Sequence, residues 1–217
     1  MSRLWRLSVF ACSMLPLPAA AAEARVLVSD ARGAPVAEAV ITADPRDGSA
    51  APAAAPQRTH VIDQKNETFI PYIEVFQRGD QVVFHNSDHT RHHAYSFAPA
   101  RQFEFVLAPG ESSPPLQLNQ LGVIAVGCNI HDTMITYFYV TDAAYVARSG
   151  PDGRARLELP AGKFDVRVWH PRQRPGSPDN AQQVESTATD GPMAELKFGL
   201  ALLPDPRVAP DRERATY

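Results

Sequence analysis

The chain has 217 residues, of which 44% are hydrophobic and 21% are charged. This composition excludes a natively disordered chain, because it supplies enough apolar surface for one sizeable core or two small ones. A formal net charge of -3 leaves no basic excess, which argues against a nucleic-acid partner. The 20 prolines and 12 glycines predict many turns and extended connections, and they favour an all-β fold.

The first 22 residues have the features of a secretory signal peptide. Two arginines precede a short apolar run, and small residues follow as far as Ala22. The run is too short, and too interrupted by prolines, to be a membrane span of about 20 residues. We therefore expect residues 1–22 to be removed and the mature protein to be periplasmic, without membrane insertion. Lipid attachment at Cys12 is a competing interpretation, which Phe10 disfavours.

Extended segments and turns alternate along the rest of the chain. Residues 24–44 predict a β-hairpin around Asp30–Gly33, and residues 45–59, rich in Ala and Pro, predict a surface loop. A second hairpin-like unit is expected on either side of Pro160–Gly162. Strands at such short spacing predict a sandwich. The tail 204–217, with its prolines and mixed charges, is expected to be disordered.

Cys128 becomes the remaining cysteine of the chain once the first 22 residues are removed. In an oxidising compartment a lone thiol is a buried residue, an intermolecular bridge, a reactive thiol or a metal ligand. It ends an apolar strand in which Ile124, Val126 and Cys128 share one face. The thiol is therefore expected at the inner end of a core strand.

The segment after this strand carries the strongest chemical signal. Cys128, His131 and Met134 place a thiolate, an imidazole and a thioether in one loop, with the spacing C-x-x-H-x-x-M. Thiolate and thioether favour Cu(I), imidazole accepts Cu(I) or Cu(II), and a His-His-Cys plane with a distant Met is the blue-copper arrangement. The second histidine is expected from the histidine-rich segment 86–96.

With these residues the sequence resembles the cupredoxin family, and in particular amicyanin and the plastocyanin-like periplasmic proteins labelled methylamine utilisation proteins. The resemblance is carried by residues between about 24 and 170: Gly79-Asp80, Val83-Phe84, Asn86, Asp88, His92, Tyr95-Ser96, Pro109–Ser112, Gly122-Val123, Cys128–His131, Gly162 and Val168–His170. It implies a Greek-key β-sandwich over residues 23–141, followed by a small β-rich segment over 142–203. It also implies one copper ion per chain, bound by His92, Cys128, His131 and Met134.

Two positions depart from the family pattern. His93 stands where relatives carry the asparagine that braces the copper loop, and Asp132 replaces a proline. An alternative register makes His93 the ligand in place of His92, although Asn86 and Asp88 keep the family spacing to His92. His60, His85, His89 and His170 are interpreted as solvated side chains. Tyr137, Phe138, Tyr139 and Trp169 are interpreted as core or sheet-face aromatics.

The leading functional hypothesis is a one-electron carrier that cycles between Cu(I) and Cu(II) and exchanges electrons with a redox protein whose identity the sequence does not reveal. A second hypothesis is a protein that binds or delivers copper or zinc without redox chemistry, suggested by the cluster His85, His89, His92 and His93. A third is a metal-free interaction module. No Ser-His-Asp spacing, phosphate loop or carboxylate pair supports an enzyme.

Overall fold

The computed structural model describes residues 21–46, 56–174, 180–186 and 195–208. Within these ranges the chain forms strands β1 to β16 and one short 3-10 helix, η1 (Pro206–Val208), so the all-β prediction is confirmed. No described helix has the length and apolar character needed to cross a bilayer. Residues 1–20 of the predicted signal peptide lie outside the described residues, while Ala21 and Ala22 begin β1.

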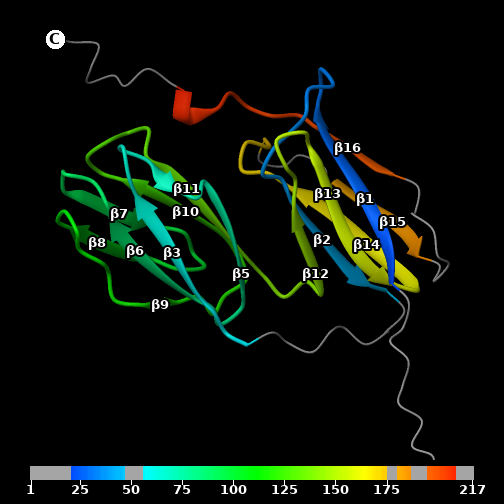
Figure 1. The fold of residues 1–217 in the computed structure, drawn as a ribbon, viewed down its shortest axis with the longest axis horizontal. Helices are drawn as coiled ribbons and strands as arrows, with labels where there is room; N and C mark the ends of the chain where they lie inside the picture. Colours follow the sequence, from blue (N-terminus) through cyan, green and yellow to red (C-terminus); the bar gives the residue numbers. More distant parts are fainter. Residues whose placement is uncertain (1–20, 47–55, 175–179, 187–194, 209–217) are drawn as a thin grey trace, which may run out of the picture.

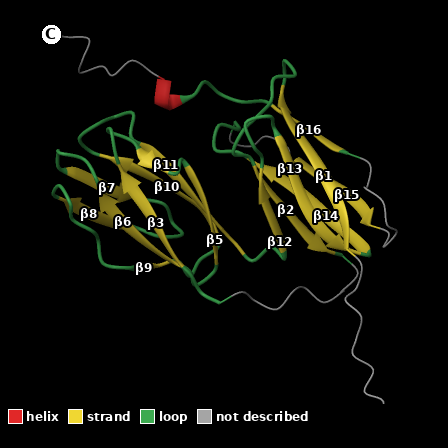
Figure 2. Ribbon diagram, in the orientation of Figure 1, coloured by secondary structure: helices red, strands yellow, loops and turns green. Residues whose placement is uncertain are grey.

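The strands form two β-sandwiches that lie side by side (Figures 1 and 2). We call the first the inserted sandwich. Its sheets have the strand orders β4-β3-β6-β9 and β5-β11-β10-β7-β8. Its strands are β3 (Thr59–Gln64), β4 (Phe69–Ile70), β5 (Ile73–Gln77), β6 (Gln81–Asn86), β7 (His92–Ser96), β8 (Phe103–Leu107), β9 (Leu116–Gln117), β10 (Gly122–Cys128) and β11 (Ile135–Thr141).

The second unit, the host sandwich, is built from both ends of the chain. Its sheets have the orders β13-β1-β16 and β12-β2-β14-β15. Its strands are β1 (Ala21–Asp30), β2 (Val40–Pro45), β12 (Tyr145–Arg148), β13 (Arg154–Pro160), β14 (Gly162–Trp169), β15 (Asn180–Ser186) and β16 (Leu196–Leu200). The chain therefore leaves the host sandwich after β2 and returns to it at β12.

This arrangement differs from the expected division at residues 141 and 142. Strands β1 and β2, which the sequence analysis places with the metal site, pair with strands that follow residue 144. The β-rich segment is thus part of a complete second sandwich, because buried residues of β1 and β2 share one core with those of the later strands.

Neither predicted hairpin forms a pair of neighbouring strands, although Ser29 and Pro35 make an isolated antiparallel bridge beside the first turn. The turn at Asp30–Gly33 is present, with the Gly33 amide donating to the Asp30 carbonyl at 2.9 Å. However, β1 and β2 belong to different sheets, and so do β13 and β14 on either side of Pro160–Gly162. Each connection carries the chain from one layer of the sandwich to the other, because both layers need an apolar face toward the shared core.

Alternation of side chains produces a separate core in each sandwich. In β13, for example, Ala155, Leu157 and Leu159 are buried while Arg154, Arg156 and Glu158 are exposed. The core of the inserted sandwich is rich in phenylalanine. Phe84 is fully buried there, with ring-centroid distances of 5.8 Å to Phe138 and 6.2 Å to Phe69.

A smaller apolar cluster joins the two sandwiches. Tyr137 and Tyr139 of β11 face outward and meet Trp169 of β14, whose ring lies 5.0 Å from that of Tyr139. The residues after β16 reach the same junction, where the guanidinium of Arg207 lies 3.6 Å from the centre of the Tyr72 ring. Residues 204–208 of the expected disordered tail are therefore ordered against the rest of the molecule, and residues 209–217 lie outside the described residues.

Candidate metal centre

Cys128 lies at the inner end of β10, where the alternation predicts it. Ile124 and Val126 are fully buried and Cys128 is 5% exposed, so all three face the core of the inserted sandwich. The Cys128 thiol is free. The backbone N–H of Ile130 donates to Sγ at 3.4 Å, which directs the sulfur into the loop that follows the strand. The sulfur is thus shielded from solvent yet close to the surface.

His92 begins β7 and is completely buried. The preceding loop is shaped by Asn86, whose side-chain amide donates to the carbonyls of Thr90 at 2.8 Å and Leu107 at 3.0 Å. The Asn86 side-chain oxygen accepts from the Asp88 backbone N–H at 3.0 Å. A fully buried amide with these partners holds the loop in one shape and so fixes the start of β7.

His131 lies on the tight loop between β10 and β11. The Met134 amide donates to the His131 carbonyl at 3.0 Å, and the Cys128 amide donates to the Met134 carbonyl at 3.1 Å. These bonds fold the C-x-x-H-x-x-M segment into a compact turn. Part of the His131 side chain remains at the surface, with 18% exposure, and its Nε2 atom lies 3.7 Å from a carboxylate oxygen of Glu67.

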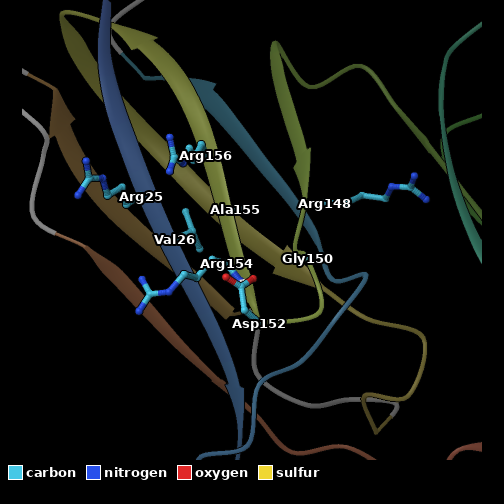
Figure 3. A pocket seen from close by; sticks show the side chains of 8 residues that line it. All are labelled: Arg25, Val26, Arg148, Gly150, Asp152, Arg154, Ala155 and Arg156. Carbon is cyan, nitrogen blue, oxygen red and sulfur yellow. Dashed lines mark hydrogen bonds between the residues drawn. The ribbon is translucent and has the colours of Figure 1, made fainter.

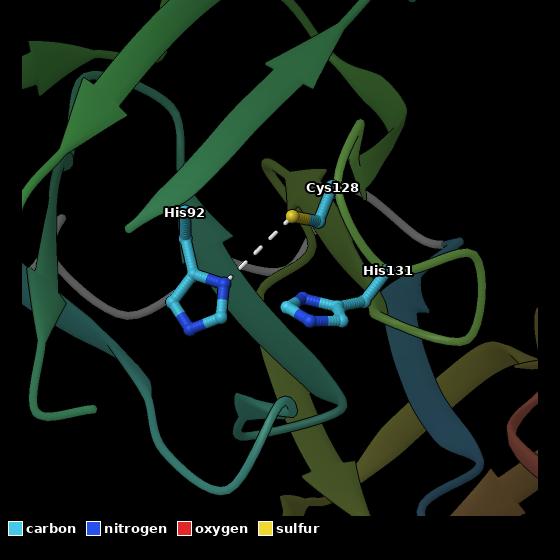
Figure 4. A group of neighbouring side chains, drawn as sticks. All are labelled: His92, Cys128 and His131. Carbon is cyan, nitrogen blue, oxygen red and sulfur yellow. Dashed lines mark hydrogen bonds between the residues drawn. The ribbon is translucent and has the colours of Figure 1, made fainter. Parts of the chain in front are cut away.

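The three side chains converge (Figure 4). One ligand atom from each of His92, Cys128 and His131 lies within 4.8 Å of the other two, and Nδ1 of His92 is 3.9 Å from Sγ of Cys128. Nδ1 of His131 is buried and has no hydrogen-bond partner among the described residues. A buried nitrogen without a partner is costly. A metal ion bound by this nitrogen, the thiolate and the His92 imidazole would remove that cost, so the residues fit a metal.

Asp88 is not a member of this group but holds His92 in place. Its carboxylate accepts from Nε2 of His92 at 2.7 Å and from the amides of Asn66 at 2.6 Å and Glu67 at 2.9 Å. Burial acts to raise the pKa of the Asp88 carboxyl, but the two amides and the imidazole outweigh burial and hold this pKa below its ordinary value. The carboxylate therefore stays ionised and directs Nδ1 of His92 toward the sulfur.

The other predicted residues are placed as follows. Met134 is 1% exposed and belongs to the same core cluster as Cys128. His93 points to the opposite face of the sheet, where its Nε2 atom lies 2.8 Å from Glu104. His85 contacts the hydroxyl of Ser112 at 2.9 Å, and His89 is exposed. The structure thus brings His92 to Cys128 and His131, while His93, His85 and His89 lie outside that group.

A different charged feature lies on the host sandwich. A cavity of about 530 Å³ is lined by residues that include Arg25, Arg148, Arg154 and Arg156. In Figure 3 the side chain of Arg148 points away from the other three arginines. Glu23 pairs with Arg25 at 2.7 Å and with Arg156 at 3.1 Å, and Glu195 pairs with Arg154. Internal ion pairs thus satisfy Arg25, Arg154 and Arg156.

Three comparisons with known proteins give only distant similarity. No family model and no curated protein matches the sequence. Solved structures match at low identity: a reduced variant of amicyanin (18% identity, 46% of this chain and 99% of that chain, TM-score 0.35) and a copper-containing nitrite reductase from Thermus scotoductus SA-01 (23%, 45% and 25%, TM-score 0.35). An amicyanin variant with Cu(I) matches at 15% identity over 38% of this chain and 82% of that chain, again with a TM-score of 0.35.

Proposed function

We propose that the protein is a periplasmic type 1 copper protein that carries one electron at a time. The observation that carries the proposal is the convergence of a buried thiol and two imidazole nitrogens within 4.8 Å, in the group His92, Cys128 and His131. A thiolate with two imidazoles is the equatorial ligand set of blue-copper sites. Copper, when bound, supplies a one-electron couple between Cu(I) and Cu(II).

The chain contributes a fixed geometry for this chemistry. His92 is held by Asp88 at 2.7 Å, and Cys128 is held by the Ile130 amide at 3.4 Å. Since these partners are set by packed loops and strands, the ligand atoms need to move little when the charge of the site changes. A hydrogen bond to the sulfur also withdraws electron density from it, and such bonds tune the reduction potential.

Met134 is the proposed fourth ligand. Its backbone closes the ligand loop through hydrogen bonds to His131 and Cys128, and its side chain is buried in the core that contains the thiol. A weakly bound thioether beside a thiolate and two imidazoles would complete the blue-copper ligand set. Core packing also buries Met134, so a substitution that keeps its volume, Met134→Leu, separates a ligand from a core residue.

His131 is the proposed point of entry and exit for electrons. It is the member of the group with surface exposure, 18%, whereas His92 is fully buried. We propose that a redox protein exchanges electrons with the site and that the protein works in the periplasm. The proposed periplasmic location rests on the sequence features of residues 1–22. The proposal assigns no catalysed reaction to the chain.

Absorption and EPR spectra of the copper-loaded protein test this proposal. We expect an intense thiolate-to-copper absorption in the red part of the visible spectrum for the wild type and its loss in Cys128→Ser. Equal spectra for the two proteins would refute the proposal. A protein that binds Zn(II) tightly but forms no coloured Cu(II) state would instead be a non-redox metal-binding protein, and a folded protein that binds neither metal would be an interaction module.

A further inference from the structure

The two sandwiches share only a small junction. Among the described strands every pairing lies within one sandwich, so no sheet continues from one sandwich into the other. Each sandwich also has its own hydrophobic core. The cluster between them has Val40, Tyr72 and Ile73 as its buried members. Two bodies with separate cores and a small shared surface move relative to one another unless further contacts hold them together.

The segment after β16, residues 201–208, supplies one such contact, and we call it the strap. The host sandwich holds its first part. Leu202 forms an isolated bridge with Gln173, and the Leu203 amide donates to the Arg172 carbonyl at 2.7 Å. From there the strap runs toward the inserted sandwich and ends in η1 (Figure 1). The strap therefore spans the junction.

Arg207 of the strap contacts both sandwiches. Its guanidinium carbon lies 3.6 Å from the ring centre of Tyr72, a buried residue of the inserted sandwich. Its Nη1 atom lies 3.8 Å from a carboxylate oxygen of Glu38, in the loop between β1 and β2 of the host sandwich. The Asp205 carboxylate accepts from the guanidinium at 2.7 Å and so directs it toward the ring. A cation over an aromatic face is attracted by the ring, so Arg207 links the two sandwiches.

A second arginine holds the next two residues of the inserted sandwich. Arg148 of β12 donates to the Ile73 carbonyl, and its Nη1 atom lies 3.6 Å from a carboxylate oxygen of Glu74. Two arginines from the strap and the host sandwich therefore bind three consecutive residues, 72–74. The Tyr72 carbonyl also accepts from the Tyr137 amide at 2.9 Å, which ties this segment to β11. A contact with residues 72–74 thus holds the sheet that contains Cys128.

We propose that Arg148 and Arg207 form a latch that holds the two sandwiches as one rigid body, and that high ionic strength opens this latch. The side chain of Arg148 is 42% exposed, and those of Arg207 and Glu38 are each 37% exposed. Salt screens contacts between such partly exposed charges, with a Debye length of about 3 Å at 1 M. When the latch opens, each sandwich keeps its own core and stays folded. The inference goes beyond electron transfer and applies equally to the copper-free chain.

Acrylamide quenching of Trp169 fluorescence in the copper-free chain tests the latch. Trp169 lies in the junction, 5.0 Å from the Tyr139 ring, and Trp5→Phe makes it the single tryptophan of the parent chain. We expect Arg207→Gln to raise the ratio of open to closed molecules about two- to fivefold, the effect of losing one cation–π contact, and so to raise the quenching constant. Arg167→Gln is the matched control, because it removes an exposed arginine that pairs with Asp44 and Asp165 inside the host sandwich.

Sodium chloride should reproduce the effect of the substitution. At about 1 M it should raise the quenching constant of the parent chain. It should have little further effect on the double variant with Arg148→Gln and Arg207→Gln, because the charges that salt screens are then absent. An equal salt effect in the parent chain and the double variant would overturn the proposal.

Nitrogen-15 relaxation separates opening of the latch from unfolding. In the parent chain both sandwiches should tumble with one rotational correlation time. In the double variant the correlation times of both sandwiches should fall, while the amide shifts of core residues such as Val126 and Leu157 stay native. An unchanged common correlation time, a quenching constant equal to that of the parent chain, or loss of native shifts in either core would overturn the latch. Each of these results would leave the proposed copper site intact, because they are measured without copper.

Discussion

Asp88 holds His92 by one ring nitrogen while the other faces the thiol. The Asp88 carboxylate lies 2.7 Å from Nε2, and Sγ of Cys128 lies 3.9 Å from Nδ1. This division of roles fixes both the tautomer and the direction of the imidazole, because a carboxylate accepts the Nε2 proton and leaves Nδ1 free to bind a metal. The same carboxylate ties the loop at Asn66 and Glu67 to the site.

Replacing Asp88 by Asn should weaken metal binding. The amide has about the same size, but it lacks the charge that orients His92 and makes it a stronger donor. We expect the affinity for copper to fall about 10- to 100-fold, the usual effect of losing such a partner. Competition with a chelator of known affinity measures it. An unchanged affinity would show that packing alone orients His92. Asp132→Asn, an exposed change within the ligand loop, is the control.

Two substitutions separate the ligand role of Met134 from its packing role. Met134→Leu keeps the volume and should cost less than about 1.5 kcal/mol in the unfolding free energy of the copper-free protein. Met134→Ala leaves a cavity and should cost about 2–5 kcal/mol. If the thioether is a ligand, both variants shift the reduction potential and the absorption spectrum. A Leu variant with the spectrum and potential of the wild type would assign Met134 to the core alone.

His60 should stabilise the fold in its protonated form. Its Nδ1 atom lies 2.7 Å from Glu74 and its Nε2 atom 3.2 Å from Asp80. The hydrogen bond to Glu74 is the main cause that raises the pKa of His60; burial opposes it and Asp80 adds to it. Because the folded pKa exceeds the unfolded value of about 6.5, this stabilisation is complete below pH 6.5 and is lost as the pH rises through the folded pKa.

Urea unfolding of the copper-free protein at several pH values measures this effect. The difference in unfolding free energy between the wild type and His60→Gln should shrink as the pH rises above about 6.5. The same substitution at the exposed His89 serves as the control. A difference that stays constant over this range would mean that His60 contributes packing and neutral hydrogen bonds only.

His170 should have the opposite effect on the pH dependence of stability. It is 4% exposed, and its Nδ1 atom accepts from the Arg172 amide at 3.2 Å. Burial lowers the pKa of His170 to about 4, and the nearby cations of Arg172 and Arg207 add to the effect. Between about pH 6.5 and pH 4 the unfolded chain binds a proton that the folded chain refuses, so stability falls as the pH falls.

The loss should reach about 3 kcal/mol near pH 4 and should be smaller in His170→Asn, whose side chain does not titrate. Unfolding free energies of the two proteins between pH 4 and pH 7 check this. The carboxylates contribute equally in both proteins, so the difference between the two unfolding free energies reports on His170 alone. Parallel pH profiles would contradict the prediction.

Local patterns in the sequence predict the candidate metal ligands but not all of the residues that hold these ligands in place. The order C-x-x-H-x-x-M lies within one turn, so its geometry is local, and the alternation in β10 already directs Cys128 inward. The spacing of Asp88 to His92 belongs to the family resemblance, but the three loop residues between them imply no fixed distance, so the contact between their side chains was not predicted. His60 and His170 were expected to be solvated, but neither is. His60 lies between Glu74 and Asp80, and His170 is buried at the junction of the sandwiches.

The division into sandwiches was less predictable because it rests on long-range pairing. Turns at Asp30–Gly33 and Pro160–Gly162 look alike whether the chain folds back in one sheet or crosses to the other layer. The strands that pair with β1 are β13 and β16, which lie more than 100 residues further along the chain. Tyr137 and Tyr139 are sheet-face aromatics, as expected. Their contact with Trp169 of the other sandwich is again a long-range pairing, which local sequence patterns do not show.

Insertion of one sandwich into the other also imposes an order of assembly. Strands β1 and β2 are synthesised first, yet their partners β12, β13 and β16 emerge only after the whole inserted sandwich. All contacts of the inserted sandwich core lie between β3 and β11, so this unit can close while β1 and β2 still lack partners. Until those partners emerge, the two early strands have open edges, which are prone to wrong pairing. Rapid closure of the inserted sandwich would shorten the distance that β1 and β2 must span to meet their partners.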